Sequence, residues 1–225
     1  MLLSIKKSPR YPKLLIWYLP VRADQENAVA ATKSVMTSLV ALVAIVAEYN
    51  QDKDLLENLH KLPQALEQSL KSDWQSAIDL LQKSKSMFVI GRGFGFPIVQ
   101  EMALKLKETC GIHAEAFSEA EVLHGPFALM NKTFTTFTIL QNDESAKGTC
   151  EIVNKMTELG VNTIFASTQN CANAKVHLSV DISIHPILEP IVLLQEFYLM
   201  VNNLAVSLGF DPDSPVNLKK VTETV

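Results

Sequence analysis

The stretch KLKETCGIHAEAFSEAEVLHGP, residues 105–126, holds the side chains best suited to acid–base chemistry. Lys105 and Glu108 stand three residues apart in a segment with a helical pattern, so they share one helix face. A carboxylate beside an ammonium can act as a general base, because the positive charge favours its ionised form. A surface ion pair is the alternative interpretation, and the neighbouring Lys107 favours it.

His124 is the second candidate for proton transfer. It precedes Gly125 and Pro126, which predict a tight and rigid loop. A histidine on such a loop can exchange protons near neutral pH, although a purely structural loop histidine fits the pattern equally well. Structural, solvated or subunit-contact roles are expected for the other titratable side chains of the stretch, His113, Glu115, Glu119 and Glu121.

Two further groups could bind a small anion. The loop GRGFG, residues 91–95, follows a strand pattern and could present backbone amides to a phosphate. It lacks the lysine and hydroxyl residue of a P-loop, and Phe96 stands where a dinucleotide fingerprint has its third glycine, so a tight strand–helix turn is favoured. Lys219 and Lys220 follow the last apolar helix, where a solvated tail is the default.

Composition limits the class of protein. The 225 residues are 48% hydrophobic and 20% charged with a net charge of −4, which indicates a folded domain without a broad nucleic-acid surface. The three cysteines are widely spaced and form no CxxC pair. We therefore expect neither a disulfide nor a zinc site, no metal and no cofactor, and free or buried thiols in a reducing cytoplasm.

The elements that position these side chains begin with helices. Helical patterns cover residues 26–49, 52–70 and 73–83. Pro63 is a candidate break in the second helix, and Ser72 is a candidate N-cap of the third. The apolar stretch 35–47 is too short to span a bilayer, so we expect a buried helix and no membrane partner.

From residue 85 onward, strand patterns alternate with helix patterns. Strands are predicted over 86–91, 112–117, 133–140, 161–167 and 177–184. Helices are predicted over 96–111, 145–160 and 188–208. This alternation predicts an α/β fold, a flavodoxin-like three-layer αβα domain with a five-stranded parallel sheet, over about residues 85–208.

The motifs together resemble one known family. The string GRGFGFPIVQEMALKLKETCGIHAEAFSEAEVLHGPFALM closely resembles the second sugar isomerase (SIS) domain of tandem SIS proteins, which include the isomerase half of glucosamine-6-phosphate synthase and the glucosamine-6-phosphate deaminases. ENAVAATKS resembles the end of a first SIS domain, and NLKKVTETV resembles the family's C-terminal tail. The resemblance covers about residues 20–225, and AFSEAEVLHGP and DPDSPVNLKKVTETV resemble the deaminase branch more than the synthase.

The resemblance implies roles for single residues. Glu108 matches the family's catalytic base, and Lys105 matches the lysine that stabilises the base's neighbourhood. His124 matches a ring-opening histidine that reaches the site of a neighbouring subunit. Lys220 matches a tail lysine that closes over the sugar. The implied chemistry moves a proton between C1 and C2 of an amino-sugar phosphate or releases ammonia from it.

The resemblance also implies ligand and partner. Val29 and Ala31 match positions whose backbone lines the sugar, with Ala31 standing where the synthase has serine. The expected partners are a sugar phosphate of the glucosamine 6-phosphate or fructose 6-phosphate class and a second copy of the chain in a homodimer or higher oligomer.

Departures from the family pattern leave a second interpretation open. No SxSGxT phosphate loop of a first SIS domain occurs, and Leu2 stands where the synthase has its nucleophilic cysteine. We expect an irregular N-terminal remnant over 1–23, a helical segment over 24–84 and an SIS domain with its tail over 85–225. A truncated or frame-disturbed gene product is hypothesised. The alternative function is a non-catalytic phosphosugar-binding module.

Overall fold

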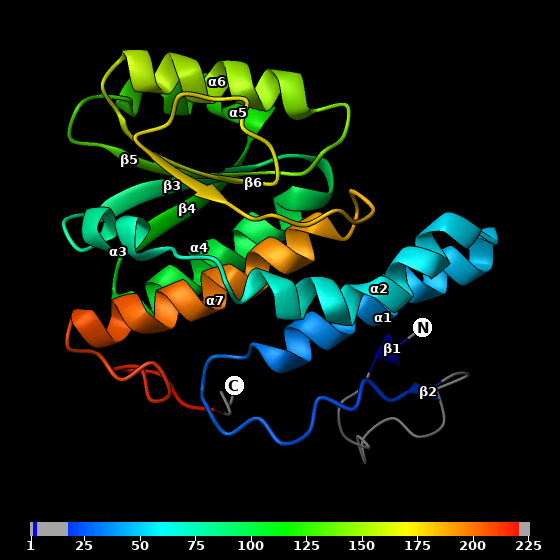
Figure 1. The fold of residues 1–225 in the computed structure, drawn as a ribbon. Coiled ribbons are helices and arrows are strands. Elements are labelled where there is room, and N and C mark those ends of the chain that lie inside the picture. Colours follow the sequence, from blue (N-terminus) through cyan, green and yellow to red (C-terminus); the bar gives the residue numbers. More distant parts are fainter. Residues whose placement is uncertain (1, 4–17, 221–225) are drawn as a thin grey trace.

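The computed structural model describes residues 2–3 and 18–220, and its centre is a five-stranded sheet (Figure 1). The strands run in the order β4-β3-β5-β6-β7, and every neighbouring pair is parallel. Their bounds are β3 Ser86–Gly91, β4 His113–Ser118, β5 Thr135–Leu140, β6 Asn162–Ser167 and β7 Val176–Ser179. The predicted α/β class and five-stranded parallel sheet are confirmed.

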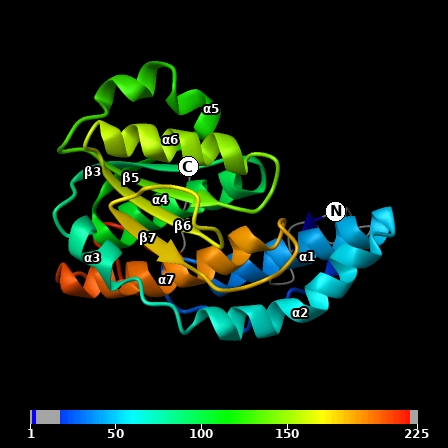
Figure 2. The same ribbon diagram turned by 45° about the horizontal axis from the view of Figure 1, so that its top comes forward.

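Helices cover both faces of the sheet, as the backbone of a parallel sheet requires. α4 (Phe96–Cys110) and α7 (Glu189–Ser207) lie on one side, whereas α5 (Glu119–Val122) and α6 (Ala146–Glu158) lie on the other (Figure 1, Figure 2). Alternate side chains of β3 serve the two layers. Val89 packs in the core with α4 and α7, and Phe88 and Ile90 pack with α6.

Three helices precede the sheet and pack on its α7 side. They are α1 (Lys33–Asn50), α2 (Lys53–Ser69) and α3 (Gln75–Leu81). α2 continues through Pro63, so the predicted break is wrong. Asp73, rather than the predicted Ser72, accepts a hydrogen bond from the Gln75 amide at the start of α3, at 2.9 Å.

α1 is less buried than the sequence predicts. Of the apolar stretch 35–47, only Ala47 is fully buried, while Leu42 and Val46 remain 46% and 49% exposed. The prediction of a buried helix is therefore wrong, because apolar composition does not show whether this chain covers the helix. By length and composition alone the 18-residue helix could also cross a membrane, as core helices of folded domains and signal sequences sometimes could. The prediction that it is too short is corrected.

Residues 26–32, predicted as the first turns of a helix, are not helical, because a side chain caps α1 from outside. Glu26 accepts hydrogen bonds from the Thr32 amide at 2.9 Å and from the Ser34 hydroxyl at 2.6 Å. Burial raises the pKa of Glu26, but these hydrogen bonds outweigh it, so the pKa is lowered overall. The cap keeps residues 28–32 outside the helix, and Ala28, Ala30 and Thr32 of this segment line a pocket.

The cysteines also differ from the prediction. Cys150 in α6 and Cys171 after β6 form a disulfide, with their Cα atoms 5.8 Å apart. The expectation that no cysteines pair is wrong, because the fold and not sequence spacing brings the two residues together. Cys110 is free and buried, and burial raises the pKa of its thiol to about 11. A thiol of this kind is unreactive at neutral pH.

The N-terminal region is described only in part. Leu2–Leu3 (β1) pairs in parallel with Tyr18–Leu19 (β2), within the segment for which the sequence predicts an irregular remnant. The rest of the predicted remnant up to residue 17 lies outside the described residues. The division at residues 23 and 84 remains a prediction, although side chains of α1, α2 and α3 belong to the same core as α4 and α7.

Candidate active site

A buried ammonium between two carboxylates forms the chemical centre of the site. Lys105 Nζ lies 2.5 Å from Glu108 Oε2 and 3.3 Å from Glu101 Oε1. All three side chains project from one face of α4, at spacings of three and four residues. Lys105 is 3% exposed, whereas Lys107 lies at the surface. The alternative of a surface ion pair is therefore wrong for Lys105.

Glu101 and Tyr198 belong to this centre and were not predicted. The Tyr198 hydroxyl donates to Glu101 Oε1 at 2.8 Å, the same oxygen that faces Lys105. Burial raises the pKa of Glu101, although Lys105 and Tyr198 act to lower it. Burial and then the charge of Glu101 raise the pKa of Tyr198, so the phenol keeps its proton and donates. The four-residue spacing to Lys105 could have indicated Glu101, but Tyr198 is 97 residues from Glu101 and no sequence pattern links them.

The tail after α7 folds back onto the segment before α1. Lys220 Nζ donates to the Ala28 carbonyl at 2.5 Å, and the Val29 amide donates to the Asp213 carbonyl at 3.0 Å. These bonds bring Lys220 onto the segment that contains Val29 and Ala31, and all three are predicted site residues. The end of the tail string, 221–225, lies outside the described residues.

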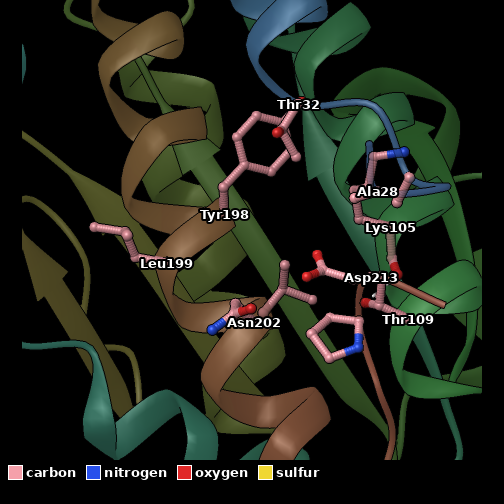
Figure 3. Close-up of a pocket in the computed structure, with 11 residues that line it drawn as sticks. Ala28, Thr32, Lys105, Thr109, Tyr198, Leu199, Asn202 and Asp213 are labelled. Carbon is pink, nitrogen blue, oxygen red and sulfur yellow. Dashed lines mark hydrogen bonds between the residues drawn. The ribbon is translucent and has the colours of Figure 1, made fainter. Parts of the chain in front are cut away.

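A cavity of about 250 Å³ lies between this segment, α4, α7 and the tail (Figure 3). Lys105 of α4 and Tyr198 of α7 line opposite walls, with Thr32 near the Tyr198 ring (Figure 3). The backbone alternation places Ala28, Ala30 and Thr32 on the cavity; Val29 and Ala31 do not line it. Glu108 does not line it either. The cavity therefore meets the charged centre from the ammonium side.

His124 lies on the other side of the sheet. It follows α5, and Val122 of α5 packs in the core with side chains of α6. The His124 side chain is exposed, and within residues 18–220 it makes no hydrogen bond or ion pair with Lys105 or Glu108. One chain thus brings Lys105 and Glu108 together and leaves His124 apart from them.

A second crevice lies at the carboxyl ends of β3 and β5, where the strand order reverses. Ligands of such sheets commonly bind at this switch point. Here a cavity of about 470 Å³ is lined by Glu119, Asp143 and Glu144 with Arg92 as its cation. Asp143 Oδ1 accepts the Ser145 amide at 2.9 Å, so a carboxylate already lies at the start of α6. The crevice is therefore acidic and poorly suited to a phosphate.

Glu119 and the glycine loop shape this crevice from inside. Glu119 is 5% exposed and accepts the Thr149 hydroxyl at 2.7 Å, so of the expected alternatives it has the structural role and is not solvated. In the GRGFG loop, a Cβ on Gly91 would lie 2.9 Å from Val99 Cγ1, and one on Gly95 would lie 2.8 Å from Gln141 Oε1. These glycines permit close packing, as expected of a tight strand–helix turn.

Among the residues that the structure describes, no group of three or more His, Cys, Asp or Glu side chains could hold a metal ion.

Comparisons with known proteins agree with the fold. A family model described as SIS domain matches residues 80–206. A glutamine–fructose-6-phosphate aminotransferase from Legionella pneumophila (strain Paris) is 32% identical over 207 residues, covering 88% of this chain and 34% of the relative. The chain spans about a third of the length of the curated relatives it matches.

Two solved structures share the architecture. The C-terminal domain of glucosamine–fructose-6-phosphate aminotransferase from Francisella tularensis is 28% identical with a TM-score of 0.78, covering 88% of this chain and 60% of that one. A protein named as a phosphosugar isomerase from Silicibacter pomeroyi DSS-3 is 32% identical with a TM-score of 0.77, covering 87% and 59%. The SIS match includes the whole sheet and both helices that carry the buried charged centre. This chain belongs to the SIS domain family.

Proposed function

We propose that the chain carries the proton-transfer part of an amino-sugar-phosphate isomerase or deaminase site, with chemistry of the glucosamine 6-phosphate to fructose 6-phosphate type. The observation that carries this proposal is the buried Lys105 ammonium held between Glu101 and Glu108. Moving a proton between C1 and C2 requires a carboxylate base and positive charge beside the developing enediolate. Relatives named as aminotransferases and a phosphosugar isomerase support the substrate class.

Glu108 is the better candidate for the base of the two carboxylates. Its side chain is 22% exposed, compared with 14% for Glu101, and Glu101 is already occupied by Tyr198 and Lys105. Lys105 keeps a positive charge next to Glu108 and stabilises negative charge on the substrate oxygens. In this assignment Glu108 takes the proton and returns it to the neighbouring carbon.

His124 takes part from a second copy of the chain. Within one chain it lies across the sheet from α4, so a ring-opening role requires an oligomer in which two copies complete each site. Lys220 lies over the segment containing Val29 and Ala31, where it can contact the sugar once its bond to the Ala28 carbonyl opens.

The switch-point crevice is poorly suited to binding the phosphate of the substrate. It is lined by three carboxylates and one arginine, and one of these carboxylates, Asp143, accepts the Ser145 amide at the start of α6. Each charge-assisted hydrogen bond to a phosphate contributes about 1.5–3 kcal/mol, so their loss weakens binding strongly. Efficient turnover therefore needs phosphate donors from another segment or another chain, and a non-catalytic binding module is the second candidate function.

The location proposed is the cytoplasm, where phosphorylated sugars are made and used. The Cys150–Cys171 pair bears on this point, because cytoplasmic reductants keep most such thiols reduced. Counting free thiols by alkylation and mass spectrometry in protein taken directly from cells tests it, and a fully oxidised pair would contradict a cytoplasmic location.

Purified protein incubated with glucosamine 6-phosphate, with ammonia and fructose 6-phosphate followed over time, tests the catalytic proposal. Turnover should disappear in Glu108→Gln and persist in Glu115→Gln, which changes an exposed glutamate on β4 in the same way. Saturable binding of glucosamine 6-phosphate by calorimetry without any turnover would favour the binding module instead.

A further inference from the structure

Two donors converge on one oxygen at the buried end of the charged centre. Glu101 Oε1 accepts the Tyr198 hydroxyl at 2.8 Å and faces Lys105 Nζ at 3.3 Å. The same ammonium is closer to Glu108 Oε2, at 2.5 Å. Lys105 therefore leans toward Glu108 while the hydroxyl serves the more buried carboxylate.

We propose that Tyr198 is a positioning residue: its hydroxyl satisfies Glu101 and thereby leaves the Lys105 ammonium directed at Glu108. Its catalytic consequence rests on the proposed function, but the positioning itself does not. Tyr198 stands on α7 and the other three side chains stand on α4, so the hydroxyl also links the two helices that form opposite walls of the cavity (Figure 3).

The three carboxylates near this hydroxyl favour its role as a donor. Glu101 and Glu108 face it from α4, and Glu26 faces it from the segment before α1. Lys105 is the cation of this centre, and Lys220 lies farther out beside Glu26. Three carboxylates around a phenol hold its proton in place, so Tyr198 donates to Glu101 and does not accept from it.

Removing the hydroxyl changes the balance between the two carboxylates. Glu101 Oε1 would be left with Lys105 as its remaining partner, and the ammonium would move toward Glu101 and away from Glu108. The donated hydrogen bond also lowers the pKa of Glu101 against the effect of burial, so its loss raises that pKa further. The movement of the ammonium and the rise in the pKa of Glu101 both follow from the loss of the Tyr198 hydroxyl oxygen.

Tyr198→Phe tests the proposal, with Tyr49→Phe as the matched control because Tyr49 is 88% exposed on α1. The first measurement is carboxyl-carbon NMR of glutamate-labelled protein across a pH series, with Glu101 assigned by Glu101→Gln. We expect the Glu101 titration to move to higher pH in Tyr198→Phe and to stay in place in Tyr49→Phe. This readout does not depend on turnover.

The second measurement is a double-mutant cycle on steady-state kinetics with glucosamine 6-phosphate. Tyr198→Phe should lower kcat by about tenfold, the loss expected for one hydrogen bond to a charged group, with KM nearly unchanged. In a Glu101→Gln background the same substitution should change kcat by less than about twofold, because the path through Glu101 is already broken.

An unmoved Glu101 titration in Tyr198→Phe would overturn the proposal, and so would an undiminished effect of Tyr198→Phe in the Glu101→Gln background. If the wild-type protein shows no turnover, the proposed function fails while the NMR titration still decides whether Tyr198 positions this centre. The two measurements therefore distinguish failure of the proposed function from failure of the positioning role of Tyr198.

Discussion

The side chain of Lys105 is 4% exposed, while that of Glu108, the carboxylate that it contacts at 2.5 Å, is 22% exposed. The cation is held inside the protein, and the carboxylate paired with it reaches the solvent. A base arranged in this way can contact a substrate while the cation paired with it stays in place. This arrangement suits repeated proton transfer at one position.

Lys105→Met should destabilise the protein strongly. It leaves Glu101 and Glu108 without their shared cation, and removing one partner of a buried ion pair costs about 3–5 kcal/mol. Urea unfolding at pH 7 measures the loss. Lys107→Met, at an exposed neighbouring position, should change the unfolding free energy by less than about 0.5 kcal/mol. Equal losses in the two variants would contradict a buried charged centre.

Glu196→Gln should flatten the pH dependence of stability. Glu196 is 3% exposed and accepts the Ser69 hydroxyl at 2.7 Å, and burial raises the pKa of its carboxyl above the usual range of a glutamate. A raised folded-state pKa means that the native state holds the proton more tightly than the unfolded state, so stability falls as pH rises above about 4.5. The variant should therefore gain stability relative to wild type near pH 7 and little near pH 4.

Urea unfolding between pH 4 and 7 measures this gain. Glu67→Gln, an exposed glutamate on α2, is the control and should leave the profile unchanged. A Glu196→Gln variant that is less stable than wild type at pH 7 and equal to it at pH 4 would show the opposite sign.

Lys220→Gln should weaken sugar-phosphate binding more than it weakens the fold. Lys220 is exposed, and its bond to the Ala28 carbonyl contributes at most about 1 kcal/mol to stability. A charged contact to the sugar phosphate is worth more, so affinity measured by calorimetry should fall about tenfold. Lys219→Gln is the matched control. Equal affinities for the two variants would remove Lys220 from the site.

His124→Ala and Glu108→Gln should complement each other when their chains are mixed. If each site takes His124 from one copy and Glu108 from the other, random pairing of the two variants into dimers makes about a quarter of all sites intact. The measurement is the turnover of each variant alone and of an equal mixture after co-refolding. A mixture no more active than the separate variants would show that His124 does not act across copies.

The sequence predicted the sheet and the Lys105–Glu108 pair because both follow from local rules. Strand alternation and β-branched runs depend on burial that repeats along the chain, as in β5, which is buried along its whole length. Two residues three apart on a helix meet regardless of the rest of the fold.

The features missed from the sequence depend on distant contacts. Tyr198 reaches Glu101 from another helix, Glu119 is buried because α6 packs over it, and Cys171 meets Cys150 through the fold of the β6–β7 loop. The start of α1 was placed too early because the Glu26 cap acts through space on residues six and eight positions later. Each error comes from a contact that sequence spacing does not encode.

In the proposed mechanism Glu108, held by Lys105, moves a proton between C1 and C2 of an amino-sugar phosphate. Proton NMR of glucosamine 6-phosphate in deuterated buffer tests it most directly, because exchange of the C2 hydrogen reports this step even where product release is slow. Exchange at C2 should depend on the enzyme, disappear in Glu108→Gln and persist in Glu115→Gln. Exchange that persists undiminished in Glu108→Gln, or no exchange with saturating wild-type protein, would contradict it.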